Sequence, residues 1–330
     1  MTLLKAPFPW FGGKSRAAQL IWERLGNVPN YCEPFAGSLA VLLGRPHAPG
    51  TETVNDKDGF VCNAWRALVA DPEAVARYAD WPCMENDLHA RHVWLKTQRD
   101  SLTARLEGDP NYYDAKIAGW WLWGIAQWIG RGWCGDSGGG PWQVVDGQLL
   151  HLGDAGQGVS RQLLHLGDAG QGVNRDKETN ALLSWFQALQ DRLRRVRVCC
   201  GDWQRVMGSS VLETHGVTGV VLDPPYLVTE RDSDLYAIDD GVIAHTVREW
   251  ALAHGDNPLL RIALCGYATP AYAMPPMWAA VPWKANGGYG NQVNGRGRAN
   301  ATREIIWFSP HCLTARQPNL WGTTSHQEGT

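Results

Sequence analysis

Apolar residues recur along the chain in two alternating patterns, one typical of helices and the other of short buried strands. Helical spacing predicts helices over residues 15–25, 59–70, 73–118 (broken at Trp81-Pro82 and at 108–110) and 181–195. Short apolar runs predict strands at the start of 31–43 and at 51–55, 196–200, 219–223, 261–265 and 303–308. Strands that alternate with helices predict an α/β fold, with a largely parallel sheet covered on both faces.

Residues 119–180 break this alternation, because they are rich in Trp and Gly and show little periodicity. The string LLHLGDAGQGV begins at Leu149 and again at Leu163, 14 residues later. Two copies are too few for a solenoid, so a duplicated surface loop and a direct DNA contact both stay open. The tryptophans at positions 120, 121, 123 and 128 have near-helical spacing, which favours core packing over stacking on bases.

Length, charge and cysteine spacing narrow the class of protein. A chain of 330 residues can form one large domain with an insertion, or two modest domains, and a net charge of -3 requires any nucleic-acid surface to be local. The eight cysteines lack C-x-x-C spacing, which fits reduced thiols in a cytoplasm. We expect neither a signal peptide nor a membrane span. We also expect no metal, and we place His89 and His92 on the surface of a helix.

The run VVLDPPY, Val220–Tyr226, places an acid directly after a buried strand. In open α/β sheets ligands bind outside the carboxyl ends of strands, where Asp223 is expected. The prolines Pro224 and Pro225 keep the backbone extended and leave carbonyl oxygens free to face a ligand. A base with an amino group could donate one hydrogen bond to Asp223 and another to the Pro224 carbonyl, while Tyr226 stacks on its ring. These two hydrogen bonds would make the amine a nucleophile. A strand-end turn without chemistry is the alternative.

Two segments near the amino terminus indicate a small-ligand pocket, namely PWFGGK at residues 9–14 and EPFAGS at residues 33–38. Glycines let a ligand approach the backbone, a helix amino terminus favours a carboxylate, and Lys14 supplies a matching charge. The spacing is not that of a phosphate-binding P-loop. Asp56, at the end of a short strand, suits paired ribose hydroxyls, with a helix cap as the alternative.

Taken in order, PWFGGK, EPFAGS, NDKDGFVCNAWRAL, GDW and LDPPY resemble the Dam-type DNA-adenine methyltransferases, whose recognition region precedes the catalytic motif. The resemblance covers residues 7–70 and 198–310. It implies a Rossmann-like methyltransferase fold with a terminal antiparallel hairpin, plus an inserted, mainly helical and irregular subdomain. The implied domains are catalytic (1–70 and 196–312), DNA-recognising (71–195) and a disordered tail (313–330). The implied reaction moves a methyl group from S-adenosylmethionine to N6 of adenine in double-stranded DNA after base flipping.

The same resemblance implies roles for individual residues. For S-adenosylmethionine it implies contacts from Trp10, Gly12, Gly13 and Lys14, with Glu33, Pro34, Phe35 and Gly37 around the methionine part. It further implies Asp56 at the ribose hydroxyls, Asp202 and Trp203 at the cofactor's adenine, and Asp223 beside the cofactor. Asp223, Pro224, Pro225 and Tyr226 would hold the target adenine.

Two glycine-flanked basic segments are candidates for DNA contact. One contains Arg131 and Trp133, and the other, residues 287–300, contains Arg296 and Arg298. A basic residue between glycines can approach a phosphate or a base edge, although a solvated loop is the alternative for the second segment. GATC-methylating relatives commonly carry a lysine at the position of Pro9, so a GATC target is not implied.

Three rival functions remain at this stage. Methylation of the amino group of cytosine, or of RNA, would use nearly the same residues, whereas a non-catalytic DNA-binding protein of the same fold belongs to another class. The acid at the head of the motif favours adenine in DNA. We expect a cytoplasmic monomer or weak dimer. The sequence leaves open a partner restriction nuclease, a phage-encoded protective role and regulation of a host.

Overall fold

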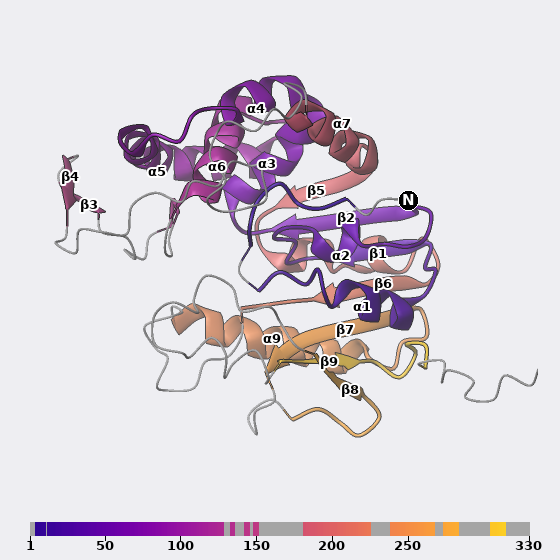
Figure 1. Cartoon of the computed structure of the whole chain (residues 1–330). Coiled ribbons are helices and arrows are strands. Elements are labelled where there is room, and N and C mark those ends of the chain that lie inside the picture. The colour runs from indigo at the N-terminus through magenta and orange to yellow at the C-terminus, as the bar shows by residue number, and fades with distance from the viewer. Residues whose placement is uncertain are drawn as a thin grey trace, which may run out of the picture.

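A seven-stranded sheet forms the centre of the computed structural model (Figure 1). The structure describes residues 4–10, 12–128, 133–135, 142–145, 148–151, 181–225, 238–267, 273–283 and 304–314. In spatial order the strands are β5 (Val196–Cys200), β2 (Thr51–Asp56), β1 (Asn30–Glu33), β6 (Thr218–Leu222), β7 (Leu260–Tyr267), β9 (Glu304–Phe308) and β8 (Ala279–Pro282). Neighbours from β5 to β7 pair in parallel, and β9 is antiparallel to both β7 and β8. The fold is the predicted Rossmann-like methyltransferase fold with its terminal antiparallel strands.

Alternation of side chains along the central strands gives the sheet two buried faces. Val221 and Ala263 belong to the core that contains α1 (Ala18–Leu25) and α2 (Ala40–Leu43). Their neighbours in sequence, Val220 and Ile262, belong to a second core with α8 (Ser209–Leu212) and α9 (Ile238–His254). Because successive strand residues point to opposite faces, an apolar run is what a strand covered on both sides requires.

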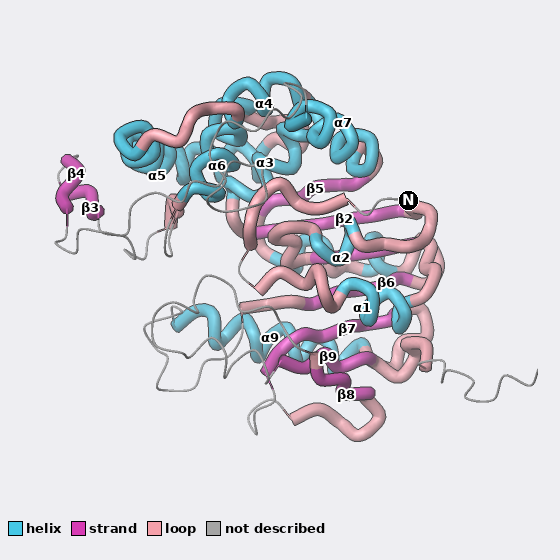
Figure 2. Tube along the Cα trace, viewed as in Figure 1, coloured by secondary structure: helices cyan, strands magenta, loops and turns pink. Residues whose placement is uncertain are grey.

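A layer of helices lies beyond the β5 edge of the sheet (Figure 2). They are α3 (Gly59–Ala70), α4 (Pro72–Ala79), α5 (Glu85–Gly108), α6 (Ala115–Gln127) and α7 (Ala181–Leu193). Aspartates begin three of them, since the side chains of Asp58, Asp71 and Asp114 accept hydrogen bonds from backbone N–H groups in the first turn. The breaks predicted near residues 81 and 109 are confirmed. The division of the chain into catalytic and recognition domains stays a prediction.

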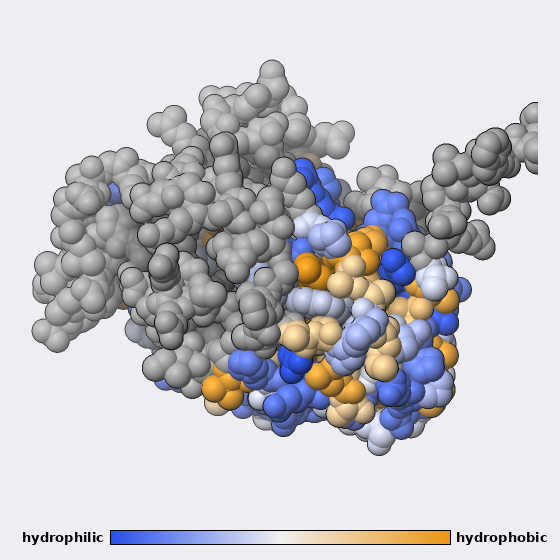
Figure 3. Space-filling view, turned by 90° about the horizontal axis from the view of Figure 1, so that it is seen from below, coloured by the Kyte–Doolittle hydropathy of each residue, from blue (hydrophilic) through white to orange (hydrophobic). Residues whose placement is uncertain are grey.

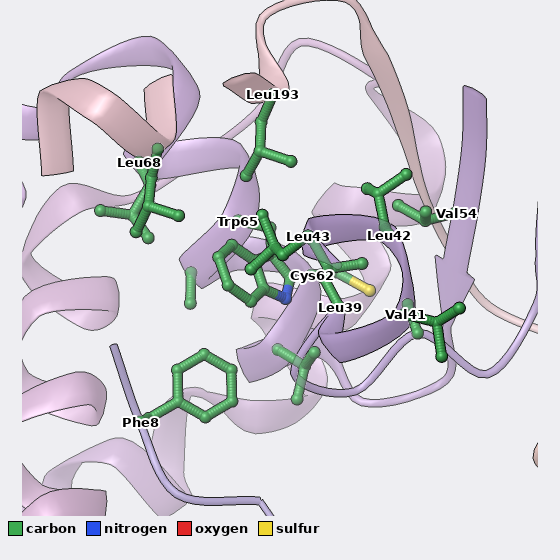
Figure 4. Close-up of a cluster of buried hydrophobic side chains, with 14 of the residues drawn as sticks. Phe8, Leu39, Val41, Leu42, Leu43, Val54, Cys62, Trp65, Leu68 and Leu193 are labelled. Carbon is green, nitrogen blue, oxygen red and sulfur yellow. The ribbon is translucent and has the colours of Figure 1, made fainter. Parts of the chain in front are cut away.

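A cluster of buried side chains joins this helical layer to the sheet (Figure 4). Phe8 from the amino-terminal segment, Trp65 from α3 and Leu193 from α7 are all 6% exposed or less. They belong to the same cluster as Leu39 and Val54, which lie beside and within the sheet. Full burial of such a side chain contributes about 1.5–3 kcal/mol. The two layers therefore share one core.

The helical layer corrects two expectations. Residues 119–127 continue helix α6, so the segment predicted to be irregular begins later than expected. His89 and His92 are buried, and their predicted surface position is wrong. The His92 ring stacks on Trp128 at a centroid distance of 4.6 Å, because the inner face of α5 packs against the residues that follow α6. Three tryptophans predicted to pack in the core do so, namely Trp121, Trp123 and Trp128.

Several predicted features fall largely outside the described residues. The first repeat copy contributes Leu149 to His151 to strand β4 (Gln148–His151), which pairs with β3 (Trp142–Val145). The remainder of both copies, and the tail from residue 315, are not described. Among the described helices, none is long and apolar enough to cross a membrane. On the described surface in Figure 3, hydrophobic and hydrophilic residues are interspersed.

Candidate active site at the carboxyl edge of the sheet

Parallel pairing brings the predicted site residues to one edge of the sheet. Glu33 ends β1, Asp56 ends β2 and Asp223 directly follows β6, and these three strands are aligned in parallel. Asp202 follows β5, the next strand beyond β2. Motifs that lie far apart in the sequence therefore converge, as expected for a ligand site at the carboxyl ends of an open sheet.

Lys14 forms an ion pair with Asp223 at the centre of this edge. Its Nζ lies 2.8 Å from Asp223 Oδ2 and donates a hydrogen bond to the Gly12 carbonyl at 2.7 Å. Only 4% of the Lys14 side chain is exposed. Burial alone would lower the pKa of Lys14, but Asp223, Cys265 and Glu304 together raise it above its ordinary value. The lysine therefore stays charged against the proposed catalytic carboxylate.

Gly37 is held where no other residue fits. Its φ is +45°, and an added Cβ would lie 2.4 Å from Trp10 Nε1. The Gly37 N–H donates to Asp56 Oδ2 at 2.8 Å, and its carbonyl accepts from Trp65 Nε1 at 2.9 Å. The structure thus brings together Trp10, Gly37 and Asp56, which the family resemblance assigned to one cofactor.

Asp56 is a half-buried carboxylate that accepts hydrogen bonds from the backbone. Its Oδ1 accepts from Asp58 N–H at 2.9 Å, and Asp58, rather than Asp56, caps α3 by accepting from Phe60 N–H at 2.8 Å. Burial raises the pKa of Asp56 to about 6, against the hydrogen bond from Asp58. The two backbone hydrogen bonds fix the orientation of this carboxylate beside Gly37.

Among the carboxyl groups of the site, Glu33 has the largest shift in pKa. Burial raises its pKa to about 8, the hydrogen bond from Tyr31 opposes this, and the charges of Asp223 and Asp56 add to it. The Tyr31 hydroxyl donates to Glu33 Oε2 at 2.9 Å. Strongly shifted groups gather at functional sites because ligands supply the missing partner. A cationic ligand beside Glu33 would favour its ionised form.

Aromatic rings border the site near β5. The rings of Phe35 and Trp203 lie 6.0 Å apart and are inclined by 28°. Asp202 is exposed and caps the short helix η1 (Trp203–Val206), since its side chain accepts from Gln204 N–H at 2.9 Å. Pro34 directly follows Glu33, and Gly13 directly precedes Lys14, so both lie at the same edge. Near β5 the site is thus bordered by the rings of Phe35 and Trp203 and by the carboxylate of Asp202.

The remaining predicted residues are described only in part. Pro224 is buried and Pro225 half-buried after Asp223, whereas Tyr226, Arg131, Arg296 and Arg298 lie outside the described residues. Trp133 is half-buried and its Nε1 donates to the Trp121 carbonyl at 3.0 Å. Its ring lies 5.3 Å from those of His92 and Trp128. Trp133 therefore packs in the helical layer, and its contact with DNA stays a prediction.

Glu304 is a site residue that the sequence reasoning missed. It begins β9 opposite Tyr267, the last residue of β7, and it is 6% exposed. Because β9 is antiparallel to β7, the amino end of β9 lies at the same edge as the carboxyl ends of the parallel strands. The signal for it in the sequence was an acid directly before an apolar run, as the string REIIWF shows.

Within the described residues, no group of three or more His, Cys, Asp or Glu could hold a metal ion.

One of two comparisons with known proteins found a match, and that match agrees with this geometry. The other found no curated protein that matches the chain. Residues 10–100 match the family model of the D12 class N6 adenine-specific DNA methyltransferases. The matched range contains Trp10, Lys14, Glu33 and Asp56 and ends before Asp223. Together with the seven-stranded α/β sheet, this match supports methylation of adenine N6 in DNA as the activity of the chain.

Proposed function

We propose that the protein is a Dam-type enzyme that moves a methyl group from S-adenosylmethionine to N6 of a flipped adenine in double-stranded DNA. The observation that carries the proposal is the placement of Asp223 directly after β6, at the same edge of the sheet as buried Glu33 and half-buried Asp56. That edge is where an α/β sheet binds its ligands. The family match supports the acceptor, adenine N6.

The residues present fit S-adenosylmethionine. This cofactor carries two positive charges, an ammonium and a sulfonium, and the site contains two carboxyls whose pKa values are raised, buried Glu33 and half-buried Asp56. A buried acid without a cation is costly, so a cationic ligand suits this donor set. Glu33 and Gly37 would hold the methionine part, and Asp56 the ribose. Phe35 and Trp203 would border the adenine of the cofactor.

In the proposed mechanism the chain binds and orients the target amine. Asp223 accepts one N6 proton in a hydrogen bond and the Pro224 carbonyl accepts the other, which directs the nitrogen lone pair away from the ring. Tyr226 stacks on the flipped base. Bound S-adenosylmethionine supplies a methyl group on sulfur as the electrophile. Alignment and exclusion of water by the buried edge of the sheet provide most of the rate increase.

The direct test is to incubate the protein with radiolabelled S-adenosylmethionine and unmethylated duplex DNA, and to identify the product nucleoside by mass spectrometry. N6-methyladenine that disappears with Asp223→Asn supports the proposal. N4-methylcytosine, or labelling of RNA alone, would favour a rival acceptor. Tight DNA binding without any labelling would favour a non-catalytic protein. Sequencing of modified bases in DNA from expressing cells would supply the target site.

The proposal extends to the setting of the enzyme. We propose a cytoplasmic monomer or weak dimer that binds duplex DNA through the helical layer and the basic segment at residues 287–300. The Dam-type assignment stays a prediction, and the sequence leaves open a phage origin and pairing with a restriction nuclease. Loss of sequence preference on exchange of the helical layer, with unchanged cofactor affinity, would support the placement of recognition in residues 71–195.

A further inference from the structure

Asn55 is a buried side chain that ties together two loops of the proposed cofactor site. It precedes Asp56 near the carboxyl end of β2, the strand that lies between β5 and β1 in the sheet (Figure 1). Its Nδ2 donates hydrogen bonds to the Pro34 carbonyl at 3.2 Å and to the Gly201 carbonyl at 3.0 Å. Asn55 is 1% exposed. One amide group therefore holds the loop after β1 and the loop after β5 at a fixed separation.

Backbone hydrogen bonds hold the same loops without help from this side chain. The Ala36 N–H donates to the Asn55 carbonyl at 2.9 Å, and the Gly201 N–H donates to the Asp56 carbonyl at 2.9 Å. The parallel pairing of β2 with β1 and β5 is likewise made by the backbone. A substitution at Asn55 thus leaves the sheet in place and removes the two side-chain hydrogen bonds, which set how far apart the loops lie.

Each of the two loops carries one aromatic ring of the site. Phe35 directly follows Pro34, and Trp203 comes two residues after Gly201. The ring centroids are 6.0 Å apart, and the rings are inclined by 28°. The proposed function places the adenine of S-adenosylmethionine against these rings. Because attraction between packed atoms falls steeply when a gap of about 0.5–1 Å opens, the position of both rings determines how well a flat base packs there.

We propose that Asn55 is a positioning residue for S-adenosylmethionine, which sets the position of Phe35 and Trp203 by holding their loops. The inference rests on the proposed function. Asn55 acts through the two rings and does not touch the reacting atoms. An asparagine suits this role because its amide nitrogen supplies two N–H donors, one for each carbonyl. An ionised aspartate of the same size supplies none and would bring a negative charge against two carbonyl oxygens.

Calorimetric titration with S-adenosylhomocysteine, the product form of the cofactor, tests the proposal without depending on activity. We expect Asn55→Ala to raise the Kd roughly tenfold, as hydrogen bonds of ordinary strength are lost. Asn55→Asp should bind at least as weakly, although it keeps the size of the side chain. Wild-type affinity in Asn55→Asp would show that the volume of the side chain matters and its N–H donors do not, and would overturn the inference. Asn55→Ser keeps one O–H donor and should give an intermediate Kd, and it carries the test if Asn55→Ala does not fold.

Asn30→Ala is the matched control, because it separates positioning from a general loss of stability. Asn30 is buried, and its Nδ2 donates to the Val211 carbonyl and to Thr218 Oγ1, both at 2.7 Å. It begins β1, whereas Asn55 lies near the carboxyl end of β2, so the two residues are at opposite edges of the sheet. Both alanine variants should lower the melting temperature, but Asn30→Ala should keep the Kd for S-adenosylhomocysteine within about twofold of wild type. Equal losses of affinity would assign the effect to stability and overturn the inference.

A double-mutant cycle with Phe35→Ala tests whether Asn55 acts through the rings. With one ring removed, Asn55→Ala should raise the Kd by a smaller factor than it does in the wild-type background. The same factor in both backgrounds would overturn the inference. A wild-type protein that does not bind S-adenosylhomocysteine would overturn the proposed function and the inference together, whereas a wild type that binds it, with unchanged affinity in Asn55→Ala, overturns the inference alone.

Discussion

Lys14 and Asp223 come from segments far apart in the sequence, and their charged groups meet at 2.8 Å. The family resemblance assigned the lysine to the cofactor, and the aspartate both to the cofactor and to the target base. Their contact means that the cofactor segment and the catalytic motif share one ion pair, in which the lysine is buried and the aspartate half-buried. Changes at either residue will therefore affect both binding and the fold.

Asp223→Ala should lower methylation by about 100-fold or more, because the hydrogen bond that prepares the amine is lost. It should also lower the melting temperature, since Lys14 is left buried without this carboxylate. Single-turnover methylation and thermal melting measure the two effects. Asp223→Asn is the matched variant, because it keeps the size of the side chain and removes its charge, and methylation should be lost with it as well. Activity of Asp223→Ala within about threefold of wild type would contradict the catalytic assignment.

Tyr226→Ala should weaken capture of the flipped base, whereas Tyr226→Phe and Tyr226→Trp should keep much of the activity. Stacking needs a ring and not a hydroxyl. The measurement is the fluorescence of 2-aminopurine at the target position together with the methylation rate. Phenylalanine as damaging as alanine would show that the hydroxyl, and not the ring, is required.

Gly37→Ala should destabilise the protein by roughly 1–3 kcal/mol, because the residue has a left-handed backbone conformation and its new Cβ would meet Trp10. Affinity for S-adenosylmethionine should fall as the contact with Asp56 is displaced. Gly108→Ala is the matched control, since a Cβ at Gly108 would meet no atom of the described residues within 4 Å. Denaturant unfolding and calorimetry measure both quantities. Equal stability of the two variants would refute the steric argument.

The free energy of unfolding should fall as pH rises from about 4.5 to about 8, and Glu33 should account for this part of the pH dependence. Its pKa is about 8 in the folded chain and near 4.5 in the unfolded chain, so over this range the folded state holds a proton that the unfolded state has released. Glu33→Gln should flatten this part of the profile. Denaturant unfolding of both proteins at several pH values measures it. Parallel profiles would contradict the raised pKa.

Binding of S-adenosylmethionine should release a proton at pH 7. The ammonium of the cofactor beside Glu33 favours the ionised carboxyl, which is mostly protonated beforehand because its pKa is about 8. Calorimetry in two buffers that differ in ionisation enthalpy counts the protons. The release should be smaller in Glu33→Gln. Binding heats that do not depend on the buffer would place the ammonium elsewhere.

Local signals were enough to predict the elements that carry the site. Helix α3 has the predicted bounds because Asp58 caps its start and Asp71-Pro72 stops it. Parallel strands place their carboxyl ends at one edge, so motifs that follow strands could be grouped without a structure. The family resemblance implied a terminal antiparallel hairpin, but the strand order of the sheet was not predicted, since no local pattern encodes it.

What was missed depends on contacts between distant segments. Strand β8 has four residues, is mostly exposed and ends at Pro282, a residue type that argues against a strand, so it was not predicted. His92 is buried because Trp128 packs against it, and helical spacing in α5 alone does not encode that contact. Glu304 precedes its strand instead of following it. Only the antiparallel direction of β9 brings it to the site.

Phe8 has a consequence for how the two substrates influence each other. Its ring lies 5.0 Å from Trp121 in the helical layer and 5.3 Å from Trp65, whose Nε1 donates to the Gly37 carbonyl of the cofactor loop. A shift of α6 on contact with DNA would thus reach Gly37 through packed rings. Any resulting coupling is reciprocal: the factor by which DNA changes affinity for S-adenosylmethionine equals the factor by which S-adenosylmethionine changes affinity for DNA.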